Sequence, residues 1–414
     1  MTLIKTSILT AIATIIRVIT SFIINKLISI YIGPSGLALI GQLQNFITIT
    51  TTFSKGAISQ GVIKYTAEYF DDNHKKNKIF STAVIITLCS SIIVGIFLNF
   101  FSNYFSEVIL KSNEYNHLFL SFSFLIILFA FNTLILSILN GQKEIKKYVL
   151  INIVSSVFSL VFTSFLIIKF GLLGALYALI LNQSIIFFIT LLFMINSAWF
   201  SVKDFMGGWD KSSGIKLGKF ALMAVVTALT IPVSHLIVRE YIGTNLSWDA
   251  AGYWQSIWYI STMYLMVVTT SLGIYYLPKL SEIKDNKLLK IEIFNGYKII
   301  MPIVSALALS IYIFREDIIY IAFTDKFLPM LELFKWQLIG DIIKIASWLL
   351  STLMLAKAMT KIFVITEILF SISFTVLSII FINYFGLIGI TYAYSLNYLL
   401  YLILMIVIFR RRFI

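Results

Sequence analysis

Charged residues, proline and cysteine are all scarce in this sequence of 414 residues. Only 12% of the residues are charged, five are Pro and one is Cys, whereas an average soluble domain carries about 25% charged residues. The lone Cys89 excludes a disulfide framework and a Cys-X-X-Cys metal pair, and we expect it to be a small core residue. His74, His117 and His235 lie far apart in the sequence. We therefore expect no metal and no cofactor.

Long polar segments and catalytic motifs are also lacking. The stretches between apolar runs reach roughly 20 residues and contain neither a Walker sequence nor a nucleophile elbow. A membrane-embedded polysaccharide polymerase or ligase would need a large outer loop, and the longest one expected, Phe314 to Leu331, is too short for that. We therefore expect a protein that is not an enzyme and whose membrane-embedded residues carry its function.

Long apolar runs are what the sequence has in abundance. Apolar residues make up 59% of the chain, 36 residues are Phe, and runs of roughly 20 residues recur, each able as a helix to cross about 30 Å of hydrocarbon. Runs such as Ile85 to Leu98 show no period of two, which excludes barrel strands. The sequence predicts an all-α, polytopic membrane protein with 12 transmembrane helices. The helices are expected at about 8–32, 35–66, 79–103, 117–140, 147–169, 172–196, 216–239, 250–278, 290–313, 333–356, 361–383 and 386–409.

Lys and Arg residues are distributed unequally between alternate connections of these helices. If the N-terminus is cytoplasmic, 21 of them fall on the cytoplasmic side. Six fall on the other side: Lys111, Lys169, Arg239, Arg315, Lys326 and Lys335. Because basic residues concentrate in cytoplasmic loops, this asymmetry predicts an even number of helices with both termini cytoplasmic.

An internal repeat with an offset of 215 residues divides the chain into halves. The segments Phe170 to Asn182 and Phe385 to Asn397 are identical at eight of 13 positions, including Gly, Tyr and Asn residues. Six helices per repeat give both halves the same orientation, so the repeat is parallel about an axis along the membrane normal. We expect an N-terminal six-helix bundle at 1–200, a cytoplasmic linker at 201–215 and a C-terminal six-helix bundle at 216–414.

Four basic residues of the first half are candidates for binding an anionic substrate, because a charge at membrane depth costs at least about 2.5 to 3.5 kcal/mol unless it faces a cavity or a partner. Arg17 lines a cavity or makes a structural pair, and Lys26 lines a cavity or snorkels to the headgroups. Lys55 lies among small residues that would admit water or a close helix. Lys64 lies close enough to the inner surface for topology alone to explain it.

The second half adds two basic candidates and two acids. Arg239 and Lys344 are further candidates for substrate binding, although Arg239 also fits a surface position. Asp341 and Glu367 are candidates for coupling to an ion gradient. Asp341 shares a helix face with Lys344, so an ion pair between them is the structural alternative. Pro232 interrupts the helix at 216–239 and predicts either a hinge or a plain kink.

These embedded charges are net cationic, which suits an anionic substrate and repels the cationic drugs that an acidic cavity would attract. A multidrug or cation antiporter of the same fold is the alternative function, and it would need an acidic pocket in one half. Coupling to an H⁺ or Na⁺ gradient would require a titratable acid, for which Asp341 and Glu367 are available.

Several short motifs resemble those of one transporter family. They are Gly33-Pro34-Ser35-Gly36-Leu37-Ala38-Leu39, Lys64-Tyr65, Lys219-Phe220-Ala221-Leu222-Met223-Ala224, Arg239, Ser247-Trp248-Asp249, Trp254-Gln255, Leu277-Pro278-Lys279-Leu280-Ser281, Trp336-Gln337-Leu338-Ile339-Gly340-Asp341 with Lys344, and Ala356-Lys357-Ala358. With them the sequence resembles the polysaccharide transporter branch of the multidrug/oligosaccharidyl-lipid/polysaccharide (MOP) flippase superfamily, and within it the O-antigen (Wzx-type) and lipid III (enterobacterial common antigen) flippases.

The resemblance implies a function that composition does not reveal. Such a flippase moves an undecaprenyl-pyrophosphate-linked oligosaccharide, an O-antigen repeat unit or lipid III, from the cytoplasmic to the periplasmic leaflet of the bacterial inner membrane. It would work by alternating access through a cationic central cavity between two MATE-like bundles. The residues of this sequence that match such a basic cavity are Arg17, Lys26, Lys64 and Arg239. The implied partners are this lipid, membrane lipids, a polysaccharide polymerase and a chain-length regulator, with no nucleic acid.

Overall fold

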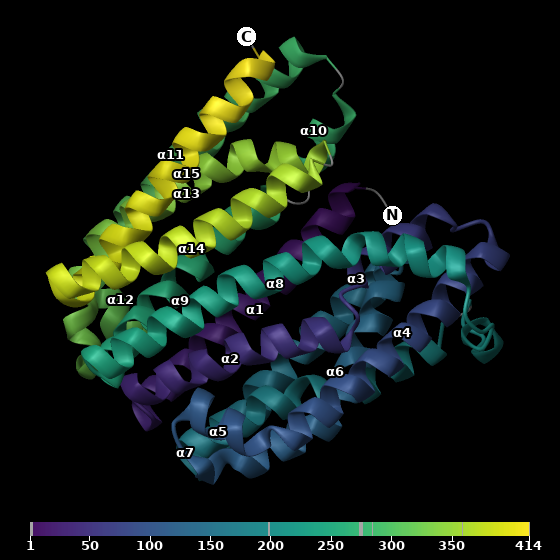
Figure 1. The fold of residues 1–414 in the computed structure, drawn as a ribbon, viewed down its shortest axis with the longest axis horizontal. Coiled ribbons are helices and arrows are strands. Elements are labelled where there is room, and N and C mark those ends of the chain that lie inside the picture. The colour runs from purple at the N-terminus through teal and green to yellow at the C-terminus, as the bar shows by residue number, and fades with distance from the viewer. Residues whose placement is uncertain (1–2, 198, 273–275, 284, 358, 414) are drawn as a thin grey trace. The chain divides into compact units, whose positions relative to one another are not determined.

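The computed structural model describes residues 3–197, 199–272, 276–283, 285–357 and 359–413. Figure 1 shows them as helices joined by short connections. No β-strand occurs among these residues, which confirms the all-α prediction. The α-helices are α1 (Leu3–Tyr31), α2 (Pro34–Ser54), α3 (Ser59–Glu68), α4 (Asn73–Phe100), α5 (Ser102–Leu110), α6 (Asn116–Gly141), α7 (Ile145–Ile195), α8 (Lys211–Asn245), α9 (Trp248–Ser271), α10 (Leu277–Glu282), α11 (Asn286–Ile313), α12 (Arg315–Ala322), α13 (Phe334–Ala356), α14 (Thr360–Phe385) and α15 (Gly389–Phe413). Short 3₁₀ helices are η1 (Asn113–Tyr115), η2 (Val202–Phe205), η4 (Asp325–Leu333) and η5 (Gly386–Ile388).

Apolar side chains cover the outward faces of the long helices. On α4, Ile92, Ile96 and Phe100 are exposed at helical spacing and form one apolar stripe. Hydrocarbon stabilises such a stripe, whereas water does not. Cys89 continues the stripe and is exposed, so the expectation of a core position was wrong. A small, weakly polar thiol is tolerated on a lipid-facing surface.

Eight stretches of the described residues are long and apolar enough to cross a membrane. Two of them, Ile145–Ile195 and Thr360–Arg410, are 51 residues long. Each contains a glycine turn, so each supplies two of the predicted helices. α2 and α9 are less apolar because polar residues such as Gln, Thr and Ser occur along them. The polytopic helical fold is confirmed, and the count of 12 crossings stays a prediction. Lys284, one of the predicted cytoplasmic cations, lies outside the described residues.

The predicted continuous helix at 35–66 is divided in the structure. α2 ends at Ser54 and α3 begins at Ser59. Between them, Gly56 and Ala57 have φ angles of 62° and 54°, a left-handed conformation that ends a helix. Hydroxyls of the threonines just before the break donate to backbone carbonyls one turn earlier, which favours bending. The prediction of one helix was therefore wrong at this point.

The same turn occurs at both copies of the repeat. Gly171, inside α7, has φ 56° and ψ −130°, and Gly386, at the end of α14, has φ 65° and ψ −149°. Glycine is the residue that reaches this region without strain. A Cβ on Gly174 would lie 2.0 Å from a backbone carbonyl oxygen, and one on Gly389 would lie 2.1 Å from the equivalent oxygen. The repeated glycines are therefore required by the tight packing of successive helices.

The chain divides into two compact units, which are described separately. Unit 1 contains residues 1–32 and 39–232, and unit 2 contains residues 33–38 and 233–414. The boundary lies inside the continuous helix α8 at Pro232, and the end of the predicted linker 201–215 already forms the start of that helix. The domain limits of 200 and 216 remain a prediction.

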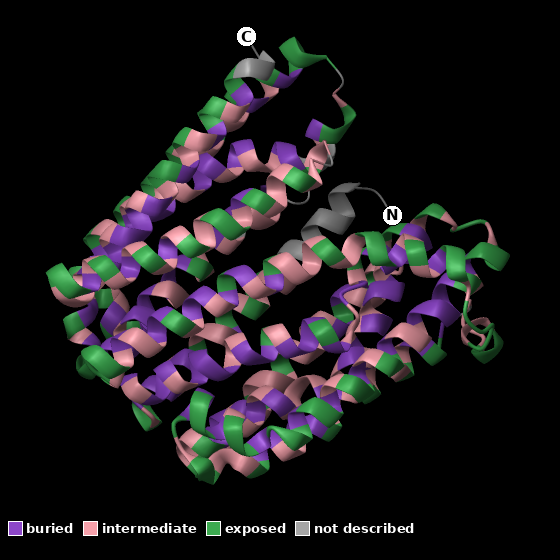
Figure 2. Ribbon diagram, viewed as in Figure 1, coloured by how far each residue is buried: buried purple, intermediate pink, exposed green. Residues whose placement is uncertain are grey.

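Each unit has its own apolar core. In unit 1, buried residues of α3, α4, α6 and the start of α8 pack together, among them Val62, Phe80 and Leu217. In unit 2, the core draws on α9, α10, α11, α13 and α15, with Val304 and Leu349 among its buried residues. Figure 2 shows buried residues recurring along the helices beside exposed ones, as expected for helices that face both protein and lipid.

Candidate functional site

Asp341 on α13 is fully buried in unit 2. Its carboxylate accepts hydrogen bonds from the hydroxyls of Ser261 (2.7 Å) and Tyr264 (2.9 Å) on α9 and of Tyr394 (2.8 Å) on α15. Gln337, one turn earlier on α13, donates to the Ser261 hydroxyl at 3.2 Å. Three hydroxyl donors compensate for the loss of water around a buried carboxylate and tie α9 and α15 to α13.

Lys344, one turn after Asp341, points its ammonium at aromatic rings. The Lys344 Nζ lies 4.9 Å from the ring centroid of Trp258, 5.2 Å from that of Trp348, 5.9 Å from that of Tyr394 and 5.5 Å from that of Tyr398. Aromatic faces attract cations, most strongly where water is excluded. The structure therefore holds this ammonium within a group of four rings.

The direct ion pair between Asp341 and Lys344, which their spacing allows, is not formed. The Asp341 oxygens accept from hydroxyls, and the Lys344 ammonium lies over rings. The two opposite charges still attract each other across one helical turn. The two charges are therefore compensated by different groups, hydroxyls for Asp341 and aromatic rings for Lys344.

Arg239 extends this cluster along α8. Its side chain is only 1% exposed, donates a hydrogen bond to Gln255 and lies 5.4 Å from the ring centroid of Trp254. The alternative of a surface position for Arg239 was therefore wrong. His235, one turn earlier, contacts the rings of Trp254 (5.2 Å) and Trp258 (4.3 Å). Trp258 also contacts Lys344. The rings of Trp254, His235 and Trp258 therefore form a continuous path from Arg239 to Lys344.

Lys55 lies in the break between α2 and α3 in unit 1, and its side chain is partly buried. Its amide donates to Thr51 at 3.3 Å, and its carbonyl accepts from Ile58 at 3.5 Å. In transporters, interrupted helices place backbone groups and charges where substrates bind. Neighbouring Ser54 is fully buried, and its hydroxyl donates to the Thr51 carbonyl at 3.0 Å.

The other predicted cations of unit 1 are spread over two helices. On α1, Arg17 is exposed and Lys26 is partly buried. On α3, Lys64 is exposed, with its Nζ 4.8 Å from the ring centroid of Tyr65 and 5.4 Å from that of Phe220. The structure thus associates Lys64 with aromatic residues near the predicted cytoplasmic surface, and it does not bring all four cations of this unit into one described cluster.

Glu367 and Pro232 complete the set of predicted residues. Glu367, on α14, is partly buried and interacts electrostatically with Tyr398 and Tyr401 of α15. Because Tyr398 also lies beneath Lys344, Glu367 borders the same cluster. Pro232 lies inside α8 where the two compact units divide, a position that suits the predicted hinge without testing it.

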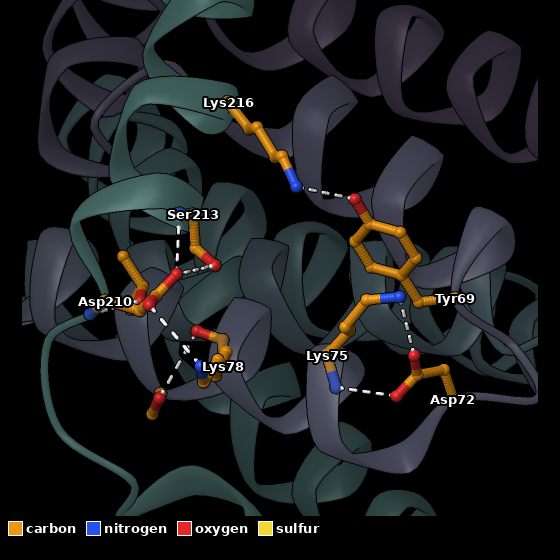
Figure 3. Close-up of polar contacts among 9 residues, drawn as sticks. Tyr69, Asp72, Lys75, Lys78, Asp210, Ser213 and Lys216 are labelled. Carbon is orange, nitrogen blue, oxygen red and sulfur yellow. Dashed lines mark hydrogen bonds and ion pairs between the residues drawn. The ribbon is translucent and has the colours of Figure 1, made fainter.

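Polar contacts order the predicted cytoplasmic end of unit 1 (Figure 3). Asp210 accepts from the Ser213 hydroxyl at 2.7 Å and the Ser213 amide at 2.8 Å, and these bonds lower the pKa of its carboxyl. Asp72 accepts from the Lys75 amide at 3.0 Å and pairs with its ammonium at 2.9 Å. The amide bond and then the ammonium lower the pKa of Asp72. Both carboxylates cap helices that begin here.

Sequence reasoning missed the hydroxyl donors around Asp341, namely Ser261, Tyr264 and Tyr394. One signal was present in the repeat, since Tyr394 aligns with Leu179 at the offset of 215 residues. A polar residue in only one copy of a repeat indicates a role beyond repeat packing. At the same offset Ser261 aligns with Phe46 and Tyr264 with Ile49, so the same signal marked these two residues.

Comparison with known proteins adds a family to this geometry. Residues 3–284 match the family described as "Polysaccharide biosynthesis protein". The chain belongs to this family. Two relatives are the "Lipid III flippase" of Escherichia coli (strain K12) and that of Shigella flexneri. Each is 27% identical to this polysaccharide biosynthesis family member over 404 residues, and the match covers 97% of this chain and 96% of the relative.

Solved structures confirm the fold of this polysaccharide biosynthesis family member. A multidrug resistance MATE family transporter of the MOP superfamily in an inward-facing conformation matches with a TM-score of 0.82 and 14% identity, covering 96% of this chain and 94% of that one. An outward-facing MATE transporter matches with a TM-score of 0.70 and 16% identity, covering 99% and 95%. The chain is therefore a multi-pass membrane protein with the MOP transporter fold.

Proposed function

We propose that this protein is a flippase that moves an undecaprenyl-pyrophosphate-linked oligosaccharide, lipid III or an O-antigen repeat unit, across the membrane by alternating access. The observation that carries the proposal is its likeness to lipid III flippases along 97% of the chain. Membership of the polysaccharide biosynthesis family supports the same substrate class. The protein catalyses no covalent step in this proposal.

The charges at membrane depth suit a lipid-linked pyrophosphate. In unit 1, Arg17 and Lys26 lie on α1 and Lys55 directly follows α2, and neither helix contains an acidic residue. In unit 2, Arg239 and Lys344 lie beside aromatic rings. Cations at this depth compensate for the hydration that a pyrophosphate loses on leaving water. Tryptophan and tyrosine rings offer flat apolar faces and hydroxyls against which sugars can pack.

Coupling to an ion gradient is assigned in this proposal to Asp341, with Glu367 as the second candidate. Asp341 is buried and is surrounded by hydroxyls, which are groups that can solvate either a proton-bearing carboxyl or a carboxylate with a bound Na⁺. Binding H⁺ or Na⁺ would change the attraction between Asp341 and Lys344, which would alter the packing of α13 against α9 and α15.

The proposal places the protein in the bacterial inner membrane with both termini cytoplasmic. The unequal distribution of basic residues supports this orientation. In this position the lipid-linked product reaches the periplasmic leaflet, where a polysaccharide polymerase and a chain-length regulator are the expected partners.

Replacement of a cell's lipid III flippase tests the proposal. Cells that lack their own flippase are expected to accumulate the lipid-linked oligosaccharide on the cytoplasmic face, and expression of this chain should restore its delivery to the outer leaflet. The Lys344→Gln variant, inserted at the same level, should restore little. Accumulation that persists with the unaltered, fully inserted protein would contradict the proposed substrate class.

A multidrug or cation antiporter is the second candidate, because the solved structures with this fold include MATE transporters. Its acidic pocket would have to be formed around Asp341, whose carboxylate is already bonded to three hydroxyls. Resistance of expressing cells to a cationic dye such as ethidium, lost in the Asp341→Asn variant, would support this candidate over the flippase.

A further inference from the structure

A second group of basic residues lies in unit 1, apart from the cluster around Asp341 in the sequence. Lysines and tyrosines from α3, the start of α4 and the start of α8 alternate in space. The Nζ of Lys64 lies 4.8 Å from the ring centroid of Tyr65, and that of Lys216 lies 5.9 Å from Tyr65 and 5.1 Å from Tyr69. The Nζ of Lys75 lies 5.8 Å from the Tyr69 ring. We call these five residues the lysine–tyrosine ladder.

Packing of α3 against α8 fixes the ladder in place. Tyr65 is buried, and its ring stacks on that of Tyr69 with centroids 6.0 Å apart. The Phe220 ring of α8 contacts Tyr65 edge-on, also at 6.0 Å. The two helices approach closely at Gly61, which has no side chain. A Cβ at this position would lie only 3.1 Å from the side chain of Leu217. The rings that carry the lysines are therefore part of a packed core rather than a mobile surface.

Figure 3 shows how Lys216 reaches from α8 to the Tyr69 hydroxyl, to which it donates a hydrogen bond of 2.8 Å. In the same view Lys75 pairs with Asp72. Among the described residues, neither Lys64 nor Lys216 forms an ion pair with a carboxylate. Glu68 and Asp210 attract Lys216 from a longer distance. Two ammonium groups on one tyrosine ring repel each other, and an anion placed between them would remove that repulsion.

The position of the ladder indicates where this anion would come from. The span of α4 begins at Asn73, just before Lys75, and Lys64 is exposed one turn before α3 ends. The ladder therefore lies at the level where a membrane surface meets water, the level that Lys and Tyr side chains favour. Lipid phosphate groups lie at this same level.

We propose that the lysine–tyrosine ladder binds the phosphate of a lipid headgroup at the cytoplasmic surface. Lys64 and Lys216 would donate to the phosphate oxygens, with the phosphate between the two ammonium groups and beside the ring of Tyr65. The positive-inside rule requires only that basic residues be present on this side. It does not require two of them to share one buried tyrosine, so the arrangement calls for a ligand.

Lipid binding by purified protein tests this inference, with a matched pair of charge changes. The variant Lys64→Gln/Lys216→Gln removes two charges from the ladder. The control Lys211→Gln/Lys219→Gln removes two from exposed positions of α8. Binding of phosphatidylglycerol to each protein in phosphatidylcholine nanodiscs is measured by native mass spectrometry. Each surface lysine changes affinity for an anionic lipid by about fivefold, so the ladder variant should bind roughly 25-fold more weakly.

Four outcomes decide the inference. Weaker binding of phosphatidylglycerol in the ladder variant alone supports a general headgroup site. Weaker binding of undecaprenyl pyrophosphate alone, in the same assay, supports a site that collects the lipid of the proposed flippase. Equal losses in both variants would show diffuse charge attraction and overturn the inference, as would unchanged binding in the ladder variant. If the ladder variant flips the lipid-linked oligosaccharide but does not bind the headgroup, the inference about the ladder fails or holds by the outcomes above, and the proposed function stands.

Discussion

At the scale of single residues, the structure compensates Asp341 and Lys344 in different ways. The carboxylate has hydrogen-bond donors from two neighbouring helices, whereas the ammonium has only ring faces. Hydroxyls compensate for lost hydration more completely than a quadrupole does. We therefore assign Asp341 a larger share in holding unit 2 together and Lys344 a larger share in binding an anion.

The Asp341→Asn variant should be less stable by about 1 to 3 kcal/mol, because an amide group meets three hydroxyl donors with one acceptor oxygen. The midpoint of thermal unfolding in detergent, followed by Trp fluorescence, measures this. Ser261→Ala supplies a double-mutant cycle, since Ser261 donates to Asp341. The effects should be less than additive. Full additivity would mean that this hydrogen bond adds little.

The Lys344→Gln variant should insert and fold while losing most outer-leaflet delivery of lipid-linked oligosaccharide. Its cation–π contacts stabilise the protein by about 0.5 to 2 kcal/mol, so a moderate drop in stability is expected. Lys335→Gln is the control, because Lys335 is exposed on the same helix. Delivery equal in Lys344→Gln and Lys335→Gln would remove Lys344 from the substrate site.

Asp210 makes the stability of unit 1 depend on acid pH. Hydrogen bonds from the Ser213 hydroxyl and amide lower its folded-state pKa below the ordinary value of 3.8. The stabilisation is therefore complete above pH 3.8 and is lost as the pH falls through the lower, folded-state pKa. Asp210→Asn should flatten the decline of the unfolding midpoint below about pH 4. An unchanged decline would show that other carboxyls cause it.

At the scale of elements, backbone conformation decides where helices end. Apolar pattern predicts the runs of helix well, since a run of lipid-facing residues has to satisfy its backbone hydrogen bonds within the helix. The same pattern does not predict a short interruption such as that at Gly56 and Ala57. It does separate the two helices that α7 joins, since the sequence predicts helices at 147–169 and 172–196 and the turn at Gly171 lies between them.

The Gly171→Ala variant should destabilise the protein by about 1 to 3 kcal/mol, because an alanine there would be forced into a region of φ and ψ that glycine tolerates. Nothing lies within 4 Å of the added Cβ, so backbone strain alone is tested. Gly218→Ala is the control. Its Cβ also has open space, and a helical alanine should be neutral or stabilising. Equal midpoints of thermal unfolding would contradict the strain at Gly171.

At the scale of the whole molecule, orientation follows from charge and loop position. The prediction that both termini are cytoplasmic depends on the unequal basic residues of alternate connections. It places Met206, which is 77% exposed, on the cytoplasmic side. Glu114, exposed between α5 and α6, falls on the periplasmic side. Met206 lies outside the apolar stretches, and Glu114 is the exposed second residue of the stretch Asn113–Gly141, so both positions can be labelled.

Single cysteines in a Cys89→Ala background test this orientation. A thiol reagent that does not cross membranes should label Glu114→Cys in cells with a permeable outer membrane and leave Met206→Cys unlabelled until the inner membrane is opened. Labelling of Met206→Cys in intact inner membranes would invert the predicted topology, and with it the side on which the lysine–tyrosine ladder lies.

The sequence by itself determined the membrane class, the helical fold, the repeat and the list of embedded charges. These follow from local properties, because the length, hydropathy and charge of a segment fix whether it can cross hydrocarbon. Only the tertiary structure decided which charges have which neighbours. Asp341 meets hydroxyls from 53 to 80 positions away, and Lys216 meets Tyr69 across 147 positions. Such contacts depend on how helices pack, which no local pattern of residues specifies.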